Sequence, residues 1–137
     1  MQQLLGTPIA NRMKAELTQQ VRENFLQDHY VAIIYCGDNP ASATYVRMKQ
    51  KFAQEIGLDL KIFGQDGQIQ TSEDLLTIAS TLSNDPLCIG YMPQLPLPAE
   101  LRSVQFELFD SIPWYKDIDG LGSHFMGKYI TNQIDML

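Results

Sequence analysis

The chain has 137 residues, of which 45% are hydrophobic, and its formal net charge is -6 at pH 7. This length suits one domain with a single core, and the negative charge argues against a nucleic acid or an anionic membrane as partner. Because no apolar run approaches the roughly 20 residues of a membrane span and no signal peptide is indicated, we expect a soluble domain that binds a small molecule.

The two cysteines, Cys36 and Cys88, fall in predicted strands and lack the spacing of a metal site. We interpret them as buried free thiols in a reducing compartment, which favours a cytoplasmic location. A disulfide between neighbouring strands is the minor alternative. No metal site is predicted.

The first predicted helix begins at Thr7-Pro8, where a capping residue precedes a first-turn proline. Apolar residues then recur at four-residue spacing, which predicts that one helix face packs on a core. These residues are Ile9, Met13, Leu17, Val21 and Phe25. The β-branched and aromatic run from Val31 to Cys36 is typical of a buried strand, and Gly37 ends it.

The second predicted helix follows that strand directly. Asn39 can cap it, Pro40 suits its first position and Gly57 ends it. Tyr45 and Lys49 are four residues apart, so on a helix the phenol and the amine share one face. They would form an acid/base pair, although such a pair often occurs by chance on a solvated helix face.

The remaining chain alternates strands and helices. A predicted strand from Leu58 to Phe63 comes first, followed by a helix that starts with a capping-box-like Thr71–Asp74 and ends at 84–86. A strand from Leu87 to Met92 follows and runs into a proline-rich segment over 93–98. A helix over 99–109 and a loop over 112–120 complete the predicted order. This alternation predicts an α/β fold, a three-layer sandwich in which helices flank a mainly parallel sheet. Ligands bind beyond the carboxyl ends of such strands, where both Gly37 and Gln94 lie.

Three ordered segments of the sequence resemble the signatures of one known family. They are Gly37 to Ser42 continuing through Tyr45, Arg47 and Lys49, then Gln94 to Pro98, then Lys116-Asp117-Ile118-Asp119-Gly120. The chain is similar to the amino-terminal catalytic domain of the bifunctional methylenetetrahydrofolate dehydrogenase/cyclohydrolase family. The resemblance covers nearly the whole chain. Met92-Pro93, His124 and Phe125 depart from the usual family pattern.

The resemblance implies a one-carbon folate enzyme. Such an enzyme oxidises methylene-tetrahydrofolate with a nicotinamide cofactor and then hydrolyses the methenyl cation to formyl-tetrahydrofolate. Lys49 would be the general base or proton relay, Tyr45 would contact the folate and position Lys49, and Gln94 would hydrogen-bond Lys49. The implied substrate-binding residues are Ser42, Tyr45, Gln94, Leu95, Pro96 and Asp119.

The residues suit that chemistry. A cationic methenyl bridge beside Lys49 would favour the neutral, proton-accepting amine. A pterin edge presents adjacent N–H donors, which a carboxylate such as Asp119 can accept in two parallel hydrogen bonds. The simpler interpretations are that Asp119 before Gly120 is a turn residue and that Gln94 only satisfies a backbone group.

The resemblance also implies that NAD or NADP is bound by a second, Rossmann-type domain. No Gly-x-Gly-x-x-Gly occurs in the sequence, so we expect residues 1–137 to form the catalytic domain without a cofactor site. Tetrahydrofolate derivatives are the expected partners. A homodimer is a possible assembly of the full-length protein. A short-chain-dehydrogenase-like enzyme is disfavoured by the same absence. A non-catalytic folate-binding or assembly module stays open.

Overall fold

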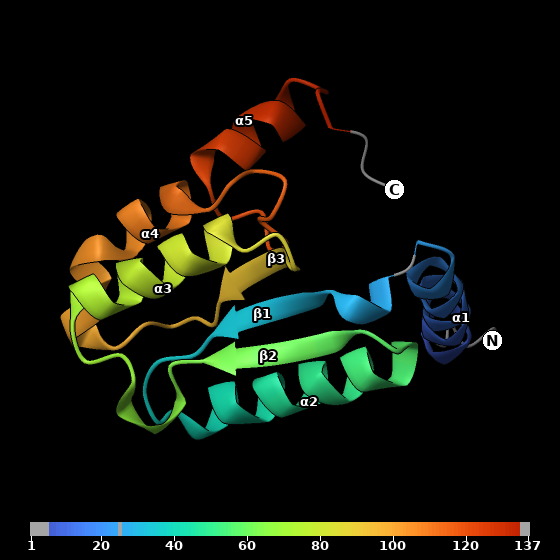
Figure 1. Ribbon diagram of the computed structural model, residues 1–137, viewed down its shortest axis with the longest axis horizontal. Coiled ribbons are helices and arrows are strands. Elements are labelled where there is room, and N and C mark those ends of the chain that lie inside the picture. The colour runs from blue at the N-terminus through green and yellow to red at the C-terminus, as the bar shows by residue number, and fades with distance from the viewer. Residues whose placement is uncertain (1–5, 25, 135–137) are drawn as a thin grey trace, which may run out of the picture.

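The computed structural model describes residues 6–24 and 26–134. Three parallel strands, β1 (Tyr30–Ile34), β2 (Asp59–Phe63) and β3 (Cys88–Pro93), form one sheet in the order β2-β1-β3 (Figure 1). The helices are α1 (Thr7–Glu23), α2 (Pro40–Ile56), α3 (Ser72–Asn84), α4 (Gln105–Ser111) and α5 (Ser123–Ile130). None of the helices within these ranges combines the length and apolarity that crossing a membrane would require.

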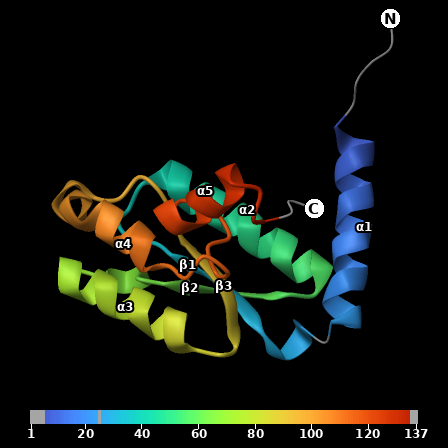
Figure 2. The same cartoon turned by 90° about the horizontal axis from the view of Figure 1, so that it is seen from above.

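The sheet separates two groups of buried side chains. Alternate residues of β1 point to opposite faces, so Ala32 and Ile34 pack with α3 and α4 while Ile33 packs with Val46 of α2. Helix α2 therefore covers one face and α3 with α4 the other, as Figure 2 shows from above. This arrangement confirms the predicted three-layer α/β sandwich with a parallel sheet.

The predicted caps of α2 and α3 are confirmed. The Asn39 side chain accepts hydrogen bonds from the amides of Ala41 and Ser42, and Gly57 ends α2 in the left-handed conformation at φ 81°. In α3, Thr71 and Asp74 form a capping box in which each side chain accepts from the other residue's amide. These caps fix where both helices begin relative to the strands before them.

The prediction that one face of α1 packs on a core is wrong for most of the helix. Only Val21 is buried, whereas Ile9 and Met13 are more than half exposed, and Phe25 lies outside the described residues. Helix α1 contacts α2 near its own carboxyl end and then projects from the body (Figure 2). Periodicity shows which residues share a helix face, but it does not show what covers that face. Thr7 is also the first helical residue and not the cap, since Gly6 holds that position.

Two further differences lie in the second half of the chain. The predicted helix over 99–109 is a 3-10 helix (Ala99–Val104) followed by α4, and α5 was not predicted. Cys36 lies just beyond β1, not within it, although both cysteines are buried. Both are free thiols, so the alternative of a disulfide is wrong.

Candidate functional site

The candidate site begins where β1 leads into α2. Gly37 turns the chain at φ 88°, a left-handed conformation that suits glycine, and the capped helix starts three residues later. Lys49 lies in the third turn of α2, half-buried against the sheet. The short connection and the cap therefore hold Lys49 at a fixed position over β1 and β3.

Lys49 meets Gln94, which is 45 residues away in sequence. The Lys49 Nζ lies 3.3 Å from the Gln94 Oε1 and 3.4 Å from the Met92 Sδ. Both partners lie at the carboxyl end of β3: Met92 is in the strand and Gln94 follows it. The structure thus brings together the predicted amine and amide, at the edge of the sheet where ligands bind in this class of fold.

Two hydrogen bonds fix Gln94. Its backbone amide donates to the Ile34 carbonyl at 2.8 Å, which continues the β1–β3 pairing beyond Pro93. Its side-chain Nε2 donates to the Leu95 carbonyl at 2.9 Å. Because the amide nitrogen is held there, Oε1 is the atom that faces Lys49. The next peptide bond, Leu95-Pro96, is cis.

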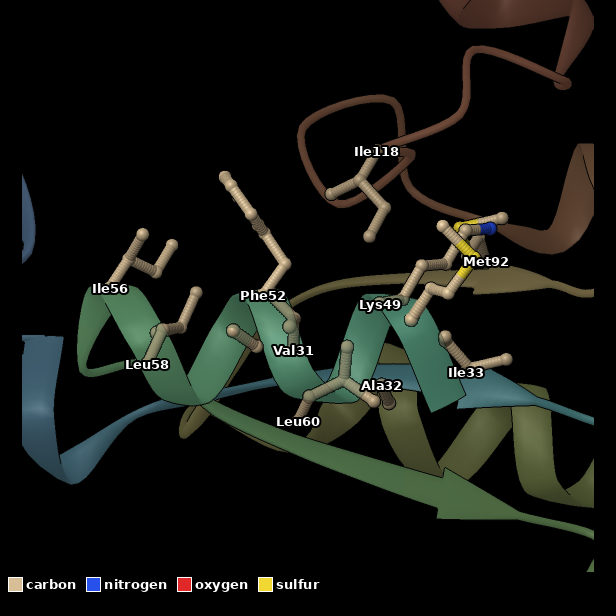
Figure 3. Close-up of a pocket in the computed structure, with 12 residues that line it drawn as sticks. Val31, Ala32, Ile33, Lys49, Phe52, Ile56, Leu58, Leu60, Met92 and Ile118 are labelled. Atoms are coloured by element: carbon tan, nitrogen blue, oxygen red, sulfur yellow. The ribbon is translucent and has the colours of Figure 1, made fainter. Parts of the chain in front are cut away.

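A mostly apolar groove of about 370 Å³ runs along α2 from Lys49. We call it the α2 groove; it is lined by Val31, Ala32, Ile33, Met48, Lys49, Phe52, Ala53, Ile56, Leu58, Leu60, Met92 and Ile118. Figure 3 shows Lys49 and Met92 side by side at one end and Ile56 and Leu58 at the other. The Lys49 amine is therefore the charged side chain among residues that are otherwise apolar.

Asp119 reaches the same region on a separate segment. It follows Ile118, which lines the α2 groove opposite the helix (Figure 3). Asp119 is exposed, and no group in the described part of the chain hydrogen-bonds its carboxylate. Its two oxygens are thus available to an external donor pair.

The other predicted residues are placed less directly. Tyr45 is 60% exposed one turn before Lys49, and no hydrogen bond joins the two side chains. Ser42 is buried in the first turn of α2 and does not line the α2 groove. Leu95 is half-buried and Pro96 exposed, next to Gln94.

Sequence reasoning missed two buried charged residues beside Asp119. Lys116 and Asp117 are only 8% and 4% exposed, although they precede Asp119 in the same five-residue segment. It also gave no role to Met92, whose sulfur touches Lys49, or to Ile118. The available signal was the Lys-Asp-Ile-Asp-Gly segment itself, in which Lys116 and Asp117 adjoin the predicted Asp119.

The amino termini of α2 and α3 are poorly suited to bind the phosphates of a dinucleotide. Phosphates bind free amides at helix amino termini, but Asn39 already occupies the first amides of α2. The start of α3 carries Glu73 and Asp74, whose negative charges oppose an anion. No group of three or more His, Cys, Asp or Glu residues within 6–24 and 26–134 is placed to hold a metal ion.

Comparison with known proteins gives a consistent match. Residues 4–119 match the family model described as tetrahydrofolate dehydrogenase/cyclohydrolase, catalytic domain. The bifunctional protein FolD of Brevibacillus brevis is 34% identical over 136 residues, covering 98% of this chain and 47% of that protein. FolD of Halothermothrix orenii is 36% identical, covering 92% of this chain and 44% of that protein.

Solved structures agree with this match. The bifunctional 5,10-methylenetetrahydrofolate dehydrogenase/cyclohydrolase from Thermoplasma acidophilum superposes with a TM-score of 0.84 at 29% identity, covering 95% of this chain and 46% of that chain. The Trypanosoma brucei enzyme, solved with NADP and an inhibitor, gives a TM-score of 0.77 at 26% identity over 95% of this chain and 44% of that chain. The chain spans about half the length of the curated relatives it matches.

Proposed function

The chain belongs to the tetrahydrofolate dehydrogenase/cyclohydrolase family through its catalytic domain, and we propose that it binds tetrahydrofolate derivatives and hydrolyses methenyl-tetrahydrofolate to formyl-tetrahydrofolate. The contact between Lys49 and Gln94 carries this proposal. It supplies a held amine at one end of an apolar groove (Figure 3), which suits proton transfer next to a flat cationic substrate.

The hydrolysis divides into water addition and bond cleavage. Water adds to the carbon of the methenyl bridge and loses one proton, which leaves a hydroxyl on that carbon. One carbon–nitrogen bond then breaks: the hydroxyl loses its proton and becomes the formyl carbonyl, while the departing nitrogen gains a proton. The neutral Lys49 amine has two N–H donors and one lone pair, so it can donate to Gln94 and Met92 while its lone pair accepts the proton of water. The positive charge of the bridge would favour that neutral form.

We propose that Asp119 orients the substrate by binding its pterin end, away from the methenyl bridge. An ionised Asp119 accepts hydrogen bonds only, and its exposed carboxylate suits the adjacent N–H donors of a pterin. Tyr45 and the Leu95-Pro96 segment flank the Lys49–Gln94 pair and are proposed to contact the rest of the folate. Ser42 is proposed to act through the start of α2, since it is buried there.

The oxidation of methylene-tetrahydrofolate needs a nicotinamide cofactor to accept the hydride. We propose that residues 1–137 form the folate-binding catalytic domain and that NAD or NADP is held by residues outside it. The occupied amides of α2 support this proposal, as does the lack of a glycine-rich phosphate loop in the sequence. We also propose a cytoplasmic location, which the two free thiols support, and a homodimer of the longer protein on the family resemblance alone.

The test is hydrolysis of methenyl-tetrahydrofolate by the purified chain and by Lys49→Ala. Lys51→Ala is the matched control, because Lys51 is an exposed lysine on the same helix. We expect the enzyme-dependent rate to be lost in Lys49→Ala and kept in Lys51→Ala. Folate binding without any rate above buffer would favour the non-catalytic binding module, and no folate binding would overturn the proposal.

A further inference from the structure

The loop that presents Asp119 is anchored at both ends by buried groups. We call residues 116–122 the Asp119 loop. At its start, the Lys116 carbonyl accepts from the Tyr91 amide at 2.8 Å, and Asp117 forms an isolated parallel bridge with Tyr91. The Lys116 Nζ donates to three carbonyls at the end of α3, those of Leu82, Ser83 and Asp85. These hydrogen bonds attach the start of the Asp119 loop to β3 and to the end of α3.

Asp117 closes the loop around Asp119. Its Oδ2 accepts from the Gly122 amide at 2.8 Å and its Oδ1 from the Leu121 amide at 3.2 Å. Asp117 as a residue is only 4% exposed, and both of its carboxylate oxygens already accept backbone amides, so we assign it no direct contact with a ligand. Both hydrogen bonds enclose Ile118, Asp119 and Gly120 and set the width of the turn that carries the exposed carboxylate.

Close packing at Gly90 and Gly122 also holds the Asp119 loop in place. A Cβ placed on Gly90 would lie 2.3 Å from the Ile118 Cγ2, so the absence of a side chain at position 90 lets Ile118 rest on β3. A Cβ on Gly122 would lie 2.9 Å from the Phe109 carbonyl and 3.2 Å from the Asp117 Oδ2. The loop fits closely on both sides, while the Asp119 carboxylate has no hydrogen-bond partner among residues 6–24 and 26–134.

We infer that Asp117 is a positioning residue that sets the Asp119 carboxylate for the substrate through the closed loop. The inference rests on the proposed function of Asp119. A carboxylate held by its own loop before the substrate arrives loses little freedom on binding, so the benefit appears as affinity. Asp117 is remote in sequence from Lys49 and Gln94 and shares no hydrogen bond with them.

Steady-state hydrolysis of methenyl-tetrahydrofolate by Asp117→Asn tests this inference. The variant keeps the shape but replaces one acceptor oxygen by an N–H donor. We expect KM to rise about tenfold with kcat within about twofold of the parent, as expected for a lost hydrogen bond that acts on binding. The matched control is Asp110→Asn, since Asp110 accepts one backbone amide, that of Ser123, just outside the loop. Its KM should not change.

A double-variant cycle separates positioning from general destabilisation. If Asp117 acts through Asp119, then Asp117→Asn changes KM in the parent but not in the Asp119→Asn background. An equal KM change in both backgrounds, or no change in the parent, would overturn the inference. Should Asp117→Asn fail to fold, Gly122→Ala disturbs the same hydrogen bond, because its Cβ would lie 3.2 Å from the Asp117 Oδ2, and it must show the same dependence on Asp119.

The same measurements distinguish a failure of the proposed function from a failure of the inference about Asp117. A parent chain without Lys49-dependent hydrolysis contradicts the proposed function. An active parent whose KM responds to Asp119→Asn but not to Asp117→Asn or Gly122→Ala contradicts only the role of Asp117.

Discussion

The side chains of Lys49 and Gln94 meet across the carboxyl edge of the sheet, with Nζ 3.3 Å from Oε1. Lys49 is fixed by a capped helix, and Gln94 by its own hydrogen bonds to Ile34 and Leu95. Since each side chain is held by a different element, the pair depends on the fold and can be tested from either side.

Removal of the Gln94 side chain should slow hydrolysis and leave the fold intact. Gln94→Ala frees the Lys49 amine to rotate away from its position, which we expect to lower kcat about 100-fold, a typical cost of misplacing a catalytic group. The measurement is the rate of methenyl-tetrahydrofolate hydrolysis at saturating substrate. Gln54→Ala, at an exposed glutamine of α2, is the control and should keep the parent rate. Equal rates for the two variants would contradict the role of Gln94.

Loss of the helix cap before Lys49 should cost stability. Asn39→Ala leaves the amides of Ala41 and Ser42 without their acceptor, and we expect the free energy of unfolding to fall by about 1 kcal/mol. Urea unfolding followed by circular dichroism measures the change. Asn39→Asp retains a capping oxygen and should stay within a few tenths of a kcal/mol of the parent. A fully stable Asn39→Ala would show that the cap does not fix the start of α2.

Lys116 should prove the most stabilising of the lysines we compare. Its ammonium satisfies three carbonyls at the end of α3, where a positive charge also suits the helix dipole. Lys116→Met leaves those carbonyls without the donor, and we expect a loss of about 3 kcal/mol in the free energy of unfolding. Lys51→Met, on the exposed face of α2, should change it by less than about 0.5 kcal/mol. Similar losses for both variants would contradict this assignment.

Acid should destabilise the fold partly through Asp85. The hydrogen bond from the Tyr30 hydroxyl, at 2.6 Å, and that from the Leu87 amide hold the pKa of Asp85 below its usual value of 3.8. A carboxyl with a lowered folded pKa stabilises the fold while it is ionised, and this contribution is lost as the pH falls through the folded pKa. The free energy of unfolding should therefore be flat above about pH 5 and fall below about pH 4.

Asp85→Asn separates this group from the other carboxyls. The variant should lose part of the acid dependence in urea midpoints measured between pH 7 and pH 3. Asp59→Asn is the control, because the Asp59 side chain accepts no hydrogen bond from the described residues and should leave the slope unchanged. A slope in Asp85→Asn identical to that of the parent would contradict the assignment.

The Cys36 thiol should be unreactive in the folded chain. Burial raises the pKa of Cys36 to about 11, from a usual value of 9.0, so at pH 8 the thiol is protonated as well as inaccessible. Labelling with an aromatic disulfide reagent should be slow in buffer and complete in urea. Fast labelling of the folded chain at both Cys36 and Cys88 would show that this core opens readily.

The sequence was sufficient for elements whose signals are local. The caps at Asn39 and Thr71 and the left-handed end at Gly57 were predictable, because each depends on the chemistry of a few neighbouring residues. The three strands were found from short apolar runs, and their alternation with helices predicted the parallel sheet. The meeting of Lys49 with Gln94 followed from the family resemblance and not from spacing.

What failed depends on contacts across the molecule. The stripe of α1 has the right spacing, but among its described residues only Val21 is buried, because the helix projects from the body (Figure 2). Lys116 and Asp117 look like ordinary surface charges in sequence, and their burial depends on the end of α3 and on the amides of the Asp119 loop. The carbonyls that bind Lys116 lie 31 to 34 residues away, where no local pattern predicts them. The amides that bind Asp117 lie only four and five residues away, but they belong to a loop without regular periodicity.

Binding of tetrahydrofolate to the isotope-labelled chain tests most directly whether one ligand spans both segments. We predict that the side-chain amide signals of Gln94 and the backbone amide signal of Gly120, next to Asp119, shift together in a nuclear magnetic resonance titration and yield one dissociation constant. Shifts confined to one of the two positions, or different constants at each, would contradict the account.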